Sequence, residues 1–123
     1  MRFTLLNVLL LIILVGCNGD GSVPTQTDDP IVEQGRRVYS QRCATCHTLT
    51  PDTILIGPSL AGIATRAESR VVDLDARSYI ELSILRPDAT IVEGFLNAMP
   101  SDLAKKLTSD ELNAIVVFLL TLE

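Results

Sequence analysis

The sequence predicts a small all-α domain of about three to five short helices over residues 30–123. An apolar stripe at positions i, i+3, i+4, i+7 and i+8 is typical of an amphipathic helix, and it consists of Leu112, Ile115, Val116, Leu119 and Leu120. Directly before this stripe, Thr108 and Glu111 have the spacing of a helix capping box. No convincing alternating strand pattern and no internal repeat is present. The 123 residues, 47% of them hydrophobic, suffice for one packed domain.

The first helix is expected to begin at Pro30, because proline fits the first helical position and Asp29 can cap the free N–H groups. Val32, Gly35 and Tyr39 share one face of this helix. Glycine costs about 1 kcal/mol in a helix interior. Gly35 therefore predicts the close approach of another helix, and the last helix is the candidate.

A middle helix is expected over residues 76–86, with Asp75 as its cap and Pro87 as its stop. Residues 48–61 and 87–101 are punctuated by glycine and proline, which is typical of loops. A small helical domain with such long loops has a modest core, so a large buried cofactor would stabilise it.

Residues 1–16 have the pattern of a signal peptide, with Arg2 followed by an apolar run. The run is too short to span a bilayer, which needs about 20 residues. It ends in Leu14-Val15-Gly16-Cys17, which resembles the lipobox of bacterial lipoproteins, in which small residues precede a cysteine that is acylated and becomes the new N-terminus. Two alternatives stay open: an ordinary signal peptide with an incidental cysteine, and an uncleaved membrane helix.

Residues 17–29 would then form a lipidated N-terminus and a flexible tether, because they are rich in glycine, serine, threonine, proline and aspartate. Diacylglycerol on Cys17 supplies at least two acyl chains, which is enough for stable membrane anchoring. We therefore expect an extracytoplasmic protein on a bacterial membrane, either in the periplasm or on the outer face of the cytoplasmic membrane.

The formal net charge is −5, and loss of Arg2 with the leader would make it more negative. An acidic protein is a poor partner for nucleic acid, which favours clustered lysine and arginine. A docking partner should present a basic patch or contact an uncharged surface. The three cysteines are an odd number, which argues against a disulfide scaffold.

The segment Cys43-Ala44-Thr45-Cys46-His47 is the Cys-x-x-Cys-His signature of haem c attachment. On one helical turn, residues i, i+3 and i+4 share a face, so two thiols can form thioethers with the haem vinyl groups and the imidazole can reach the iron. A thioredoxin-type thiol pair would need a preceding strand, and a zinc site would need a fourth ligand. The chain has one histidine and no further candidate cysteine besides Cys17.

Met99 is the candidate sixth ligand, because it is the only methionine left once Met1 leaves with the leader. It precedes Pro100 in a predicted loop, where proline favours an extended backbone. A methionine that merely fills an apolar gap is the alternative, and Lys105 or Lys106 would be the fallback ligand. Ligation by histidine and methionine raises the reduction potential and fills both axial positions, which favours electron transfer over catalysis.

Over residues 30–123 the chain resembles class I cytochrome c in its motifs and in their order. These motifs are the first helix with Gly35 and Tyr39, the haem motif, Gly57-Pro58-Ser59-Leu60, Met99-Pro100, and a last helix with Ile115 and Phe118. The resemblance implies a small all-α fold wrapped round one haem c. It implies that Gly35 and Tyr39 pack against Ile115 and Phe118. It also implies that the Pro58 carbonyl accepts a hydrogen bond from His47 and that Leu60 lines the haem pocket. The chain departs from the lysine-rich mitochondrial type, since it has only two lysines.

Three further residues are weaker candidates. Phe95 and Tyr79 could wall the pocket or approach a haem propionate, although ordinary core packing explains them equally well. Arg66 could pair with a propionate, although solvent exposure is the more common state of an isolated arginine.

The function expected is that of a membrane-anchored mono-haem cytochrome c, which transfers single electrons between redox partners in an extracytoplasmic respiratory or dehydrogenase chain. Its partners would be redox proteins or a membrane oxidoreductase complex of which it could be a subunit. The alternatives are a haem enzyme of the peroxidase kind, which needs an open axial site, and a haem-based sensor.

Overall fold

The computed structural model describes residues 29–123, and within them it has four α-helices, one 3-10 helix and no strand. The elements in chain order are α1 (Pro30–Arg42), α2 (Ile63–Ala67), α3 (Ala76–Leu85), the 3-10 helix η1 (Leu103–Lys106) and α4 (Ser109–Leu119). The all-α prediction is therefore confirmed. The predicted signal peptide, the lipidation site Cys17 and nearly all of the tether lie outside the described residues.

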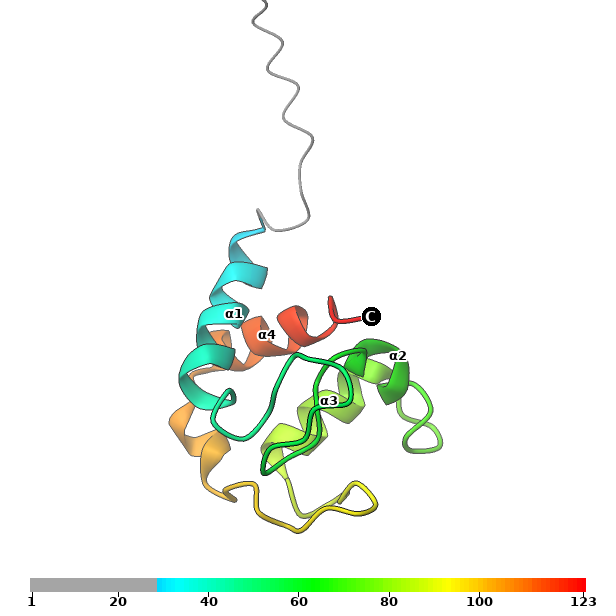
Figure 1. Ribbon diagram of the computed structural model, residues 1–123. Coiled ribbons are helices and arrows are strands. Elements are labelled where there is room, and N and C mark those ends of the chain that lie inside the picture. Colours follow the sequence, from blue (N-terminus) through cyan, green and yellow to red (C-terminus); the bar gives the residue numbers. More distant parts are fainter. Residues whose placement is uncertain (1–28) are drawn as a thin grey trace, which may run out of the picture.

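The first and last helices, α1 and α4, cross and form the largest helix contact of the domain (Figure 1). Gly35 is buried at the crossing, where an added Cβ would meet the Ala114 carbonyl oxygen and would lie 2.5 Å from the Phe118 Cβ. The Tyr39 and Phe118 rings are 5.9 Å apart between centroids. The expected close approach at Gly35 is present, with Ala114 rather than Ile115 opposite the glycine.

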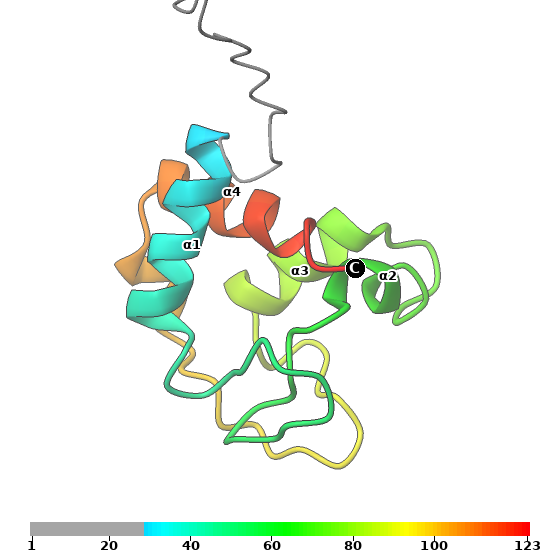
Figure 2. The same ribbon diagram turned by 45° about the horizontal axis from the view of Figure 1, so that its top comes forward.

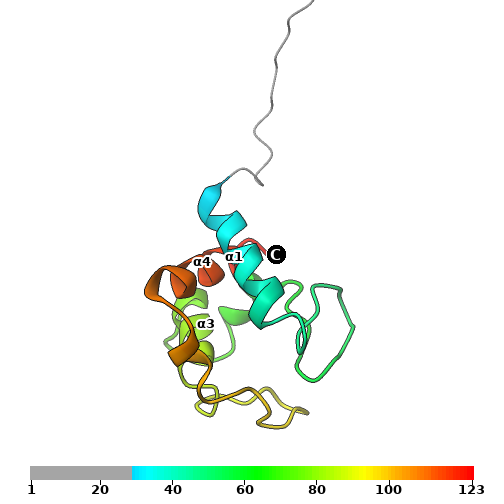
Figure 3. The same cartoon turned by 90° about the vertical axis from the view of Figure 1, so that its left-hand side faces the viewer.

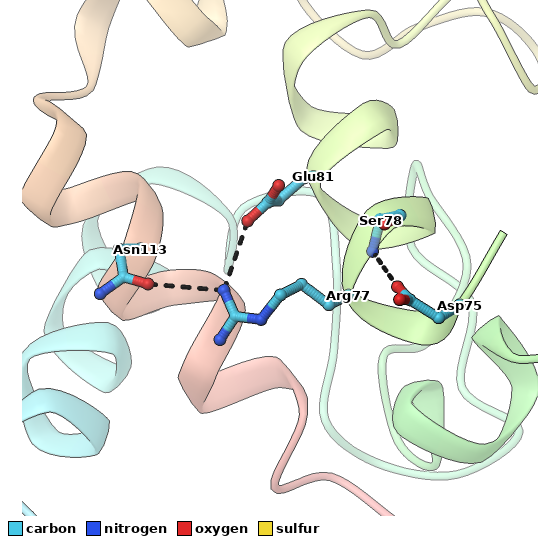
Figure 4. Close-up of polar contacts among 5 residues, drawn as sticks. All are labelled: Asp75, Arg77, Ser78, Glu81 and Asn113. Carbon is cyan, nitrogen blue, oxygen red and sulfur yellow. Dashed lines mark hydrogen bonds and ion pairs between the residues drawn. The ribbon is translucent and has the colours of Figure 1, made fainter.

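The predicted helix starts are present. The Asp29 carboxylate accepts the Ile31 N–H at the start of α1, and Thr108 and Glu111 form the complete capping box of α4. Asp75 caps α3 by accepting the Ser78 N–H at 2.7 Å (Figure 4). Each of these bonds satisfies backbone donors that a helix N-terminus leaves free.

A side chain of α3 also reaches α4. The Arg77 guanidinium donates to Glu81 on its own helix at 3.3 Å and to Asn113 of α4 at 3.4 Å (Figure 4). Both contacts are partly exposed, so their contribution to stability is small. They nevertheless mark the surface along which α3 packs beside α4.

The core lies where α1, α3 and α4 meet, and its fully buried large side chains are Ile115, Val116 and Phe118 of α4. Figure 3 shows α1, α3 and α4 together on one side of the molecule, with the long loops extending from them. The C-terminal end of the chain is tied to α2, because the Ala64 N–H donates to the Leu122 carbonyl at 3.0 Å. The helices thus form a frame from which residues 48–61 and 87–101 extend.

These two loops lie beside each other at the end of the molecule away from the C-terminus of the chain (Figure 2). Both contain turns but no helix, as predicted. Over residues 29–123, no helix has the length and apolar character needed to cross a membrane.

Candidate haem-binding site

The Cys-x-x-Cys-His segment continues directly from the end of α1. Cys43 is the C-cap of α1, and its N–H donates to the Tyr39 carbonyl at 2.8 Å. The N–H groups of Cys46 and His47 then both donate to the Cys43 carbonyl, at 3.0 and 2.9 Å. One further helical turn therefore brings the two thiols and the imidazole together, as the spacing predicted.

The His47 imidazole is fixed through its Nδ1 atom, which lies 2.8 Å from the Pro58 carbonyl oxygen. A carbonyl oxygen can only accept, so Nδ1 carries the proton of this bond, and in the neutral ring the lone pair is then on Nε2. The Pro58 contact expected from the family resemblance is thus present. It gives the ring the tautomer that a metal-ligating imidazole requires.

Two further contacts of His47 were not foreseen from the sequence. Gly57 lies against the ring so closely that an added Cβ would overlap it, at 2.8 Å from Nδ1 and closer still to Cε1. The Tyr39 hydroxyl donates to the His47 carbonyl at 2.7 Å. Burial raises the pKa of the Tyr39 hydroxyl, and the neighbouring Cys43 adds to the rise, so the phenol remains a donor.

A large, open and mainly apolar cavity lies in front of His47. With its mouth it encloses about 1230 Å³, part of which is open to solvent. Its walls come from the haem motif, from both long loops, and from α3, η1 and α4. The predicted site residues Cys43, Cys46, His47, Pro58, Leu60 and Met99 all line this cavity.

Met99 reaches the cavity from the loop of residues 87–101 and is also packed against the core. Phe95 and Tyr79, the two weaker candidates, line the same cavity. Lys105 and Lys106 do not, and the Lys106 ammonium pairs with Asp102 at 2.8 Å instead. The geometry therefore favours Met99 over either lysine as a group that can reach a ligand in the cavity.

The surroundings of Cys43 and Cys46 bear on the two alternatives to haem attachment, a thioredoxin-type thiol pair and a zinc site. Burial raises the pKa of the Cys43 thiol to about 11, with a further contribution from Cys46, whereas a catalytic thiol pair has a lowered pKa. Within residues 29–123, no cluster of three or more histidine, cysteine, aspartate or glutamate side chains is placed to hold a metal ion. A thioredoxin-type pair, which needs a preceding strand, does not fit this arrangement, because Cys43 directly follows α1.

Arg66 is neither at the haem cavity nor fully exposed to solvent, the two situations expected from the sequence. It does not line the cavity, and its side chain is partly buried rather than solvated. Its guanidinium donates to the Ser59 carbonyl at 2.8 Å and to the Ala61 carbonyl. The expectation of an exposed arginine is wrong, because two carbonyl groups of the neighbouring loop are within reach of the guanidinium.

The two long loops have an apolar and acidic surface. Ile54, Leu55 and Leu96 are each at least half exposed, and Ile54 and Leu55 lie outside the cavity wall. The charged residues of the two loops are Asp52, Asp88 and Glu93, and neither loop contains lysine or arginine. The basic or uncharged docking partner expected from the net charge stays a prediction.

The cavity fits a haem in its chemistry. Two adjacent thiols, an imidazole with a free Nε2 and a thioether all face one apolar space, and Gly57 leaves room for the imidazole against the loop. These are the groups used to hold a covalently attached haem and its iron. The fold and the site together define a c-type cytochrome.

Residues 30–119 match the family model described as Cytochrome C oxidase, cbb3-type, subunit III. The match covers most of the chain, and the chain belongs to this family. No curated protein matches the chain. The family assignment makes the protein a haem-based electron carrier with a covalently attached haem c, and cytochrome c domains are typically extracytoplasmic.

Proposed function

We propose that this protein binds a single haem c through thioethers to Cys43 and Cys46, with His47 and Met99 as the axial ligands of the iron. The observation that carries the proposal is the placement of all four side chains on one apolar cavity. When bound, the haem supplies one-electron chemistry between ferrous and ferric iron. The protein uses it to transfer single electrons between redox partners.

The protein's own groups have distinct tasks in this function. The Pro58 carbonyl holds the proton on His47 Nδ1, which directs Nε2 toward the cavity and increases its basicity. Leu60, Phe95 and other apolar side chains exclude water from the cavity. A thioether ligand and a dry pocket both raise the reduction potential.

The ligand assignment is tested by Met99→Ala in the haem-loaded protein. We expect the haem to stay covalently attached, the weak absorption band at the red end of the ferric spectrum to disappear, and the reduction potential to fall, because the thioether is lost. Leu96→Ala is the matched control, since Leu96 lines the cavity from the same loop but has no ligating atom.

An unchanged optical spectrum in Met99→Ala would remove Met99 from the ligand role and leave it as a core residue. Absence of a bonded porphyrin in the mass spectrum of the exported wild-type protein would contradict the proposal as a whole. The two results can be told apart, because the spectrum of Met99→Ala tests only the sixth ligand, whereas the mass spectrum tests covalent haem attachment.

The partner we propose is a redox protein or a membrane oxidoreductase complex in an extracytoplasmic respiratory or dehydrogenase chain. The family description names a subunit of a terminal oxidase, which supports a role beside such a complex or within it. The acidic and apolar loops around the cavity suit a partner surface with a basic border. Copurification from detergent-solubilised membranes tests whether the association is stable.

We also propose that the protein is held at a bacterial membrane by diacylglycerol on Cys17. The support is the apolar run that ends in Leu14-Val15-Gly16-Cys17. Cys17→Ala should release or misprocess the protein, as followed by membrane fractionation and mass spectrometry. The reduction potential of an exported form without the leader should stay unchanged, and continued membrane retention of the variant would contradict the anchor.

A further inference from the structure

The loop that carries Pro58 is bound to α2 through one side chain. Arg66 lies on α2 and donates from Nη2 to the Ser59 carbonyl at 2.8 Å and from Nη1 to the Ala61 carbonyl. Both acceptors lie within three residues of Pro58. Hydrogen bonds from a charged donor are about twice as strong as neutral ones, and the planar guanidinium can satisfy two carbonyls at once.

The same loop is also held from its other side. The Ser59 hydroxyl donates to the Thr50 carbonyl at 2.8 Å and accepts the Ala61 N–H at 3.1 Å. The Leu60 N–H donates to the Thr48 carbonyl at 2.8 Å. Arg66 is therefore the side-chain contact between this loop and α2, beside the backbone bond from the Ile63 N–H to the Leu60 carbonyl, whereas the bonds to residues 48–50 join the loop to the neighbouring loop segment.

The Ser59 carbonyl belongs to the peptide unit that directly follows the one containing the Pro58 carbonyl. Only the φ and ψ angles of Ser59 separate the two peptide units. Holding the Ser59 carbonyl in place therefore restricts the orientation of the Pro58 carbonyl. The Pro58 carbonyl in turn accepts from His47 Nδ1. A chain of adjacent groups thus runs from α2 through Arg66 and the Ser59–Pro58 backbone to the imidazole.

We propose that Arg66 is a positioning residue for the imidazole ligand, which acts by holding the Pro58 carbonyl in place for its hydrogen bond with His47. This inference rests on the proposed function, since it takes His47 as the iron ligand. The bond from Nδ1–H to Pro58 makes the imidazole a stronger electron donor and so favours ferric iron. Loosening it raises the reduction potential.

The charge of Arg66 has the opposite effect, because a cation near the iron favours the ferrous state. Arg66→Lys separates the two contributions. Lysine keeps the charge but is a single ammonium on a flexible stem, and it lacks the fork that reaches both carbonyls. The lysine variant therefore tests positioning, while Arg66→Gln removes both charge and fork.

The experiment uses the haem-loaded protein and measures two quantities. The first is the exchange rate of the His47 Nδ1–H proton by NMR, and the second is the reduction potential by spectroelectrochemical titration. Arg66→Lys should accelerate the exchange by about tenfold or more, the factor that corresponds to losing one hydrogen bond to a charged group. Its reduction potential should rise.

Arg70→Gln is the matched control, because Arg70 is exposed and lies four residues farther along the chain. It should leave the Nδ1–H exchange unchanged. The amide protons of Ile115 and Val116 in the core provide a second comparison. If Arg66 only stabilised the fold, their exchange would accelerate together with that of His47.

The inference would be overturned if Nδ1–H exchange were unchanged in both Arg66 variants. It would also be overturned if Arg66→Lys had the exchange rate and reduction potential of the wild type, or if exchange of the core amide protons accelerated as much as that of His47 Nδ1–H. Should Arg66→Gln fail to fold, Arg66→Lys gives the decisive measurement. A wild-type protein without covalent haem would instead contradict the proposed function. The two failures are therefore distinguishable.

Discussion

His47 is held by groups from two separate stretches of the chain, α1 and the loop of residues 48–61. Tyr39 in α1 donates to its carbonyl, Gly57 lies against its ring, and Pro58 accepts from its Nδ1. The sequence motif identified His47, and the family resemblance supplied Pro58. The contacts of Tyr39 and Gly57 depend on tertiary placement, and no local spacing rule indicates them.

Gly57 gives the first prediction. Gly57→Ala should destabilise the haem-loaded protein by about 1–3 kcal/mol, because the new Cβ overlaps the imidazole and either the ring or the loop must move. Denaturant unfolding measures the loss, and the optical spectrum reports the ring. Gly94→Ala is a control with free space around the new Cβ but a φ of +86°. It should lose stability from backbone strain alone and keep the wild-type spectrum.

Tyr39 gives the second prediction. Tyr39→Phe keeps the ring that packs on Phe118 and removes only the hydroxyl bond to the His47 carbonyl. The free energy of unfolding should fall by about 1 kcal/mol, the typical net contribution of one hydrogen bond. Denaturant unfolding is the measurement. Equal stability of the two proteins would mean that water replaces the hydroxyl without loss.

At the scale of elements, the long helices were predictable and the short ones were not. The boundaries of α1, α3 and α4 follow cap residues such as Asp75 and Thr108, which act locally. Helices α2 and η1 have five and four residues and no side-chain cap, and α2 begins after Gly62 in the left-handed conformation. Asp102 occupies the N-cap position of η1 without making a cap hydrogen bond, so neither helix start is secured by a side-chain cap and both helices depend on the surrounding chain.

The crossing of α1 and α4 gives the third prediction. Gly35→Ala should lower the free energy of unfolding by about 2 kcal/mol or more, because the added Cβ overlaps the Ala114 carbonyl and the Phe118 side chain. Ser40→Ala, at an exposed position of the same helix, controls for the helix propensity of alanine. Equal stability of Gly35→Ala and wild type would show that the two helices can separate at no cost.

At the scale of the whole molecule, the cavity was only partly predictable. The sequence separated the loops of residues 48–61 and 87–101 from the helices, and the motif order indicated that both face the haem. It indicated the middle helix only through Tyr79, a weaker candidate for the pocket wall, and it did not indicate that η1 and α4 also line the cavity, since that depends on how the helices pack. For the same reason it did not indicate Arg66 as a loop contact.

Acid stability gives the fourth prediction. The hydrogen bond from the Ser78 backbone holds the pKa of Asp75 below its usual 3.8, and the bond with Lys106 does the same for Asp102. A lowered folded pKa means that these carboxylates contribute stability above pH 3.8, and that this contribution is lost as the pH falls through the folded values. The free energy of unfolding should therefore decrease on acidification below about pH 4.

Urea unfolding at a series of pH values measures this dependence. Asp75→Asn keeps a capping side chain but cannot titrate, so its stability should depend less on pH in this range. A pH dependence identical to that of wild type would show that the Asp75 carboxylate is not among the groups responsible.

The pairing of α1 with α4 also determines the order of events during synthesis. About 70 residues separate the two helices, so at a typical rate of translation the nascent chain carries an unpartnered first helix for roughly 3–15 seconds. During this interval the thiols and the imidazole directly behind that helix are still accessible on an open polypeptide. The core can therefore close only after almost the entire domain has been synthesised.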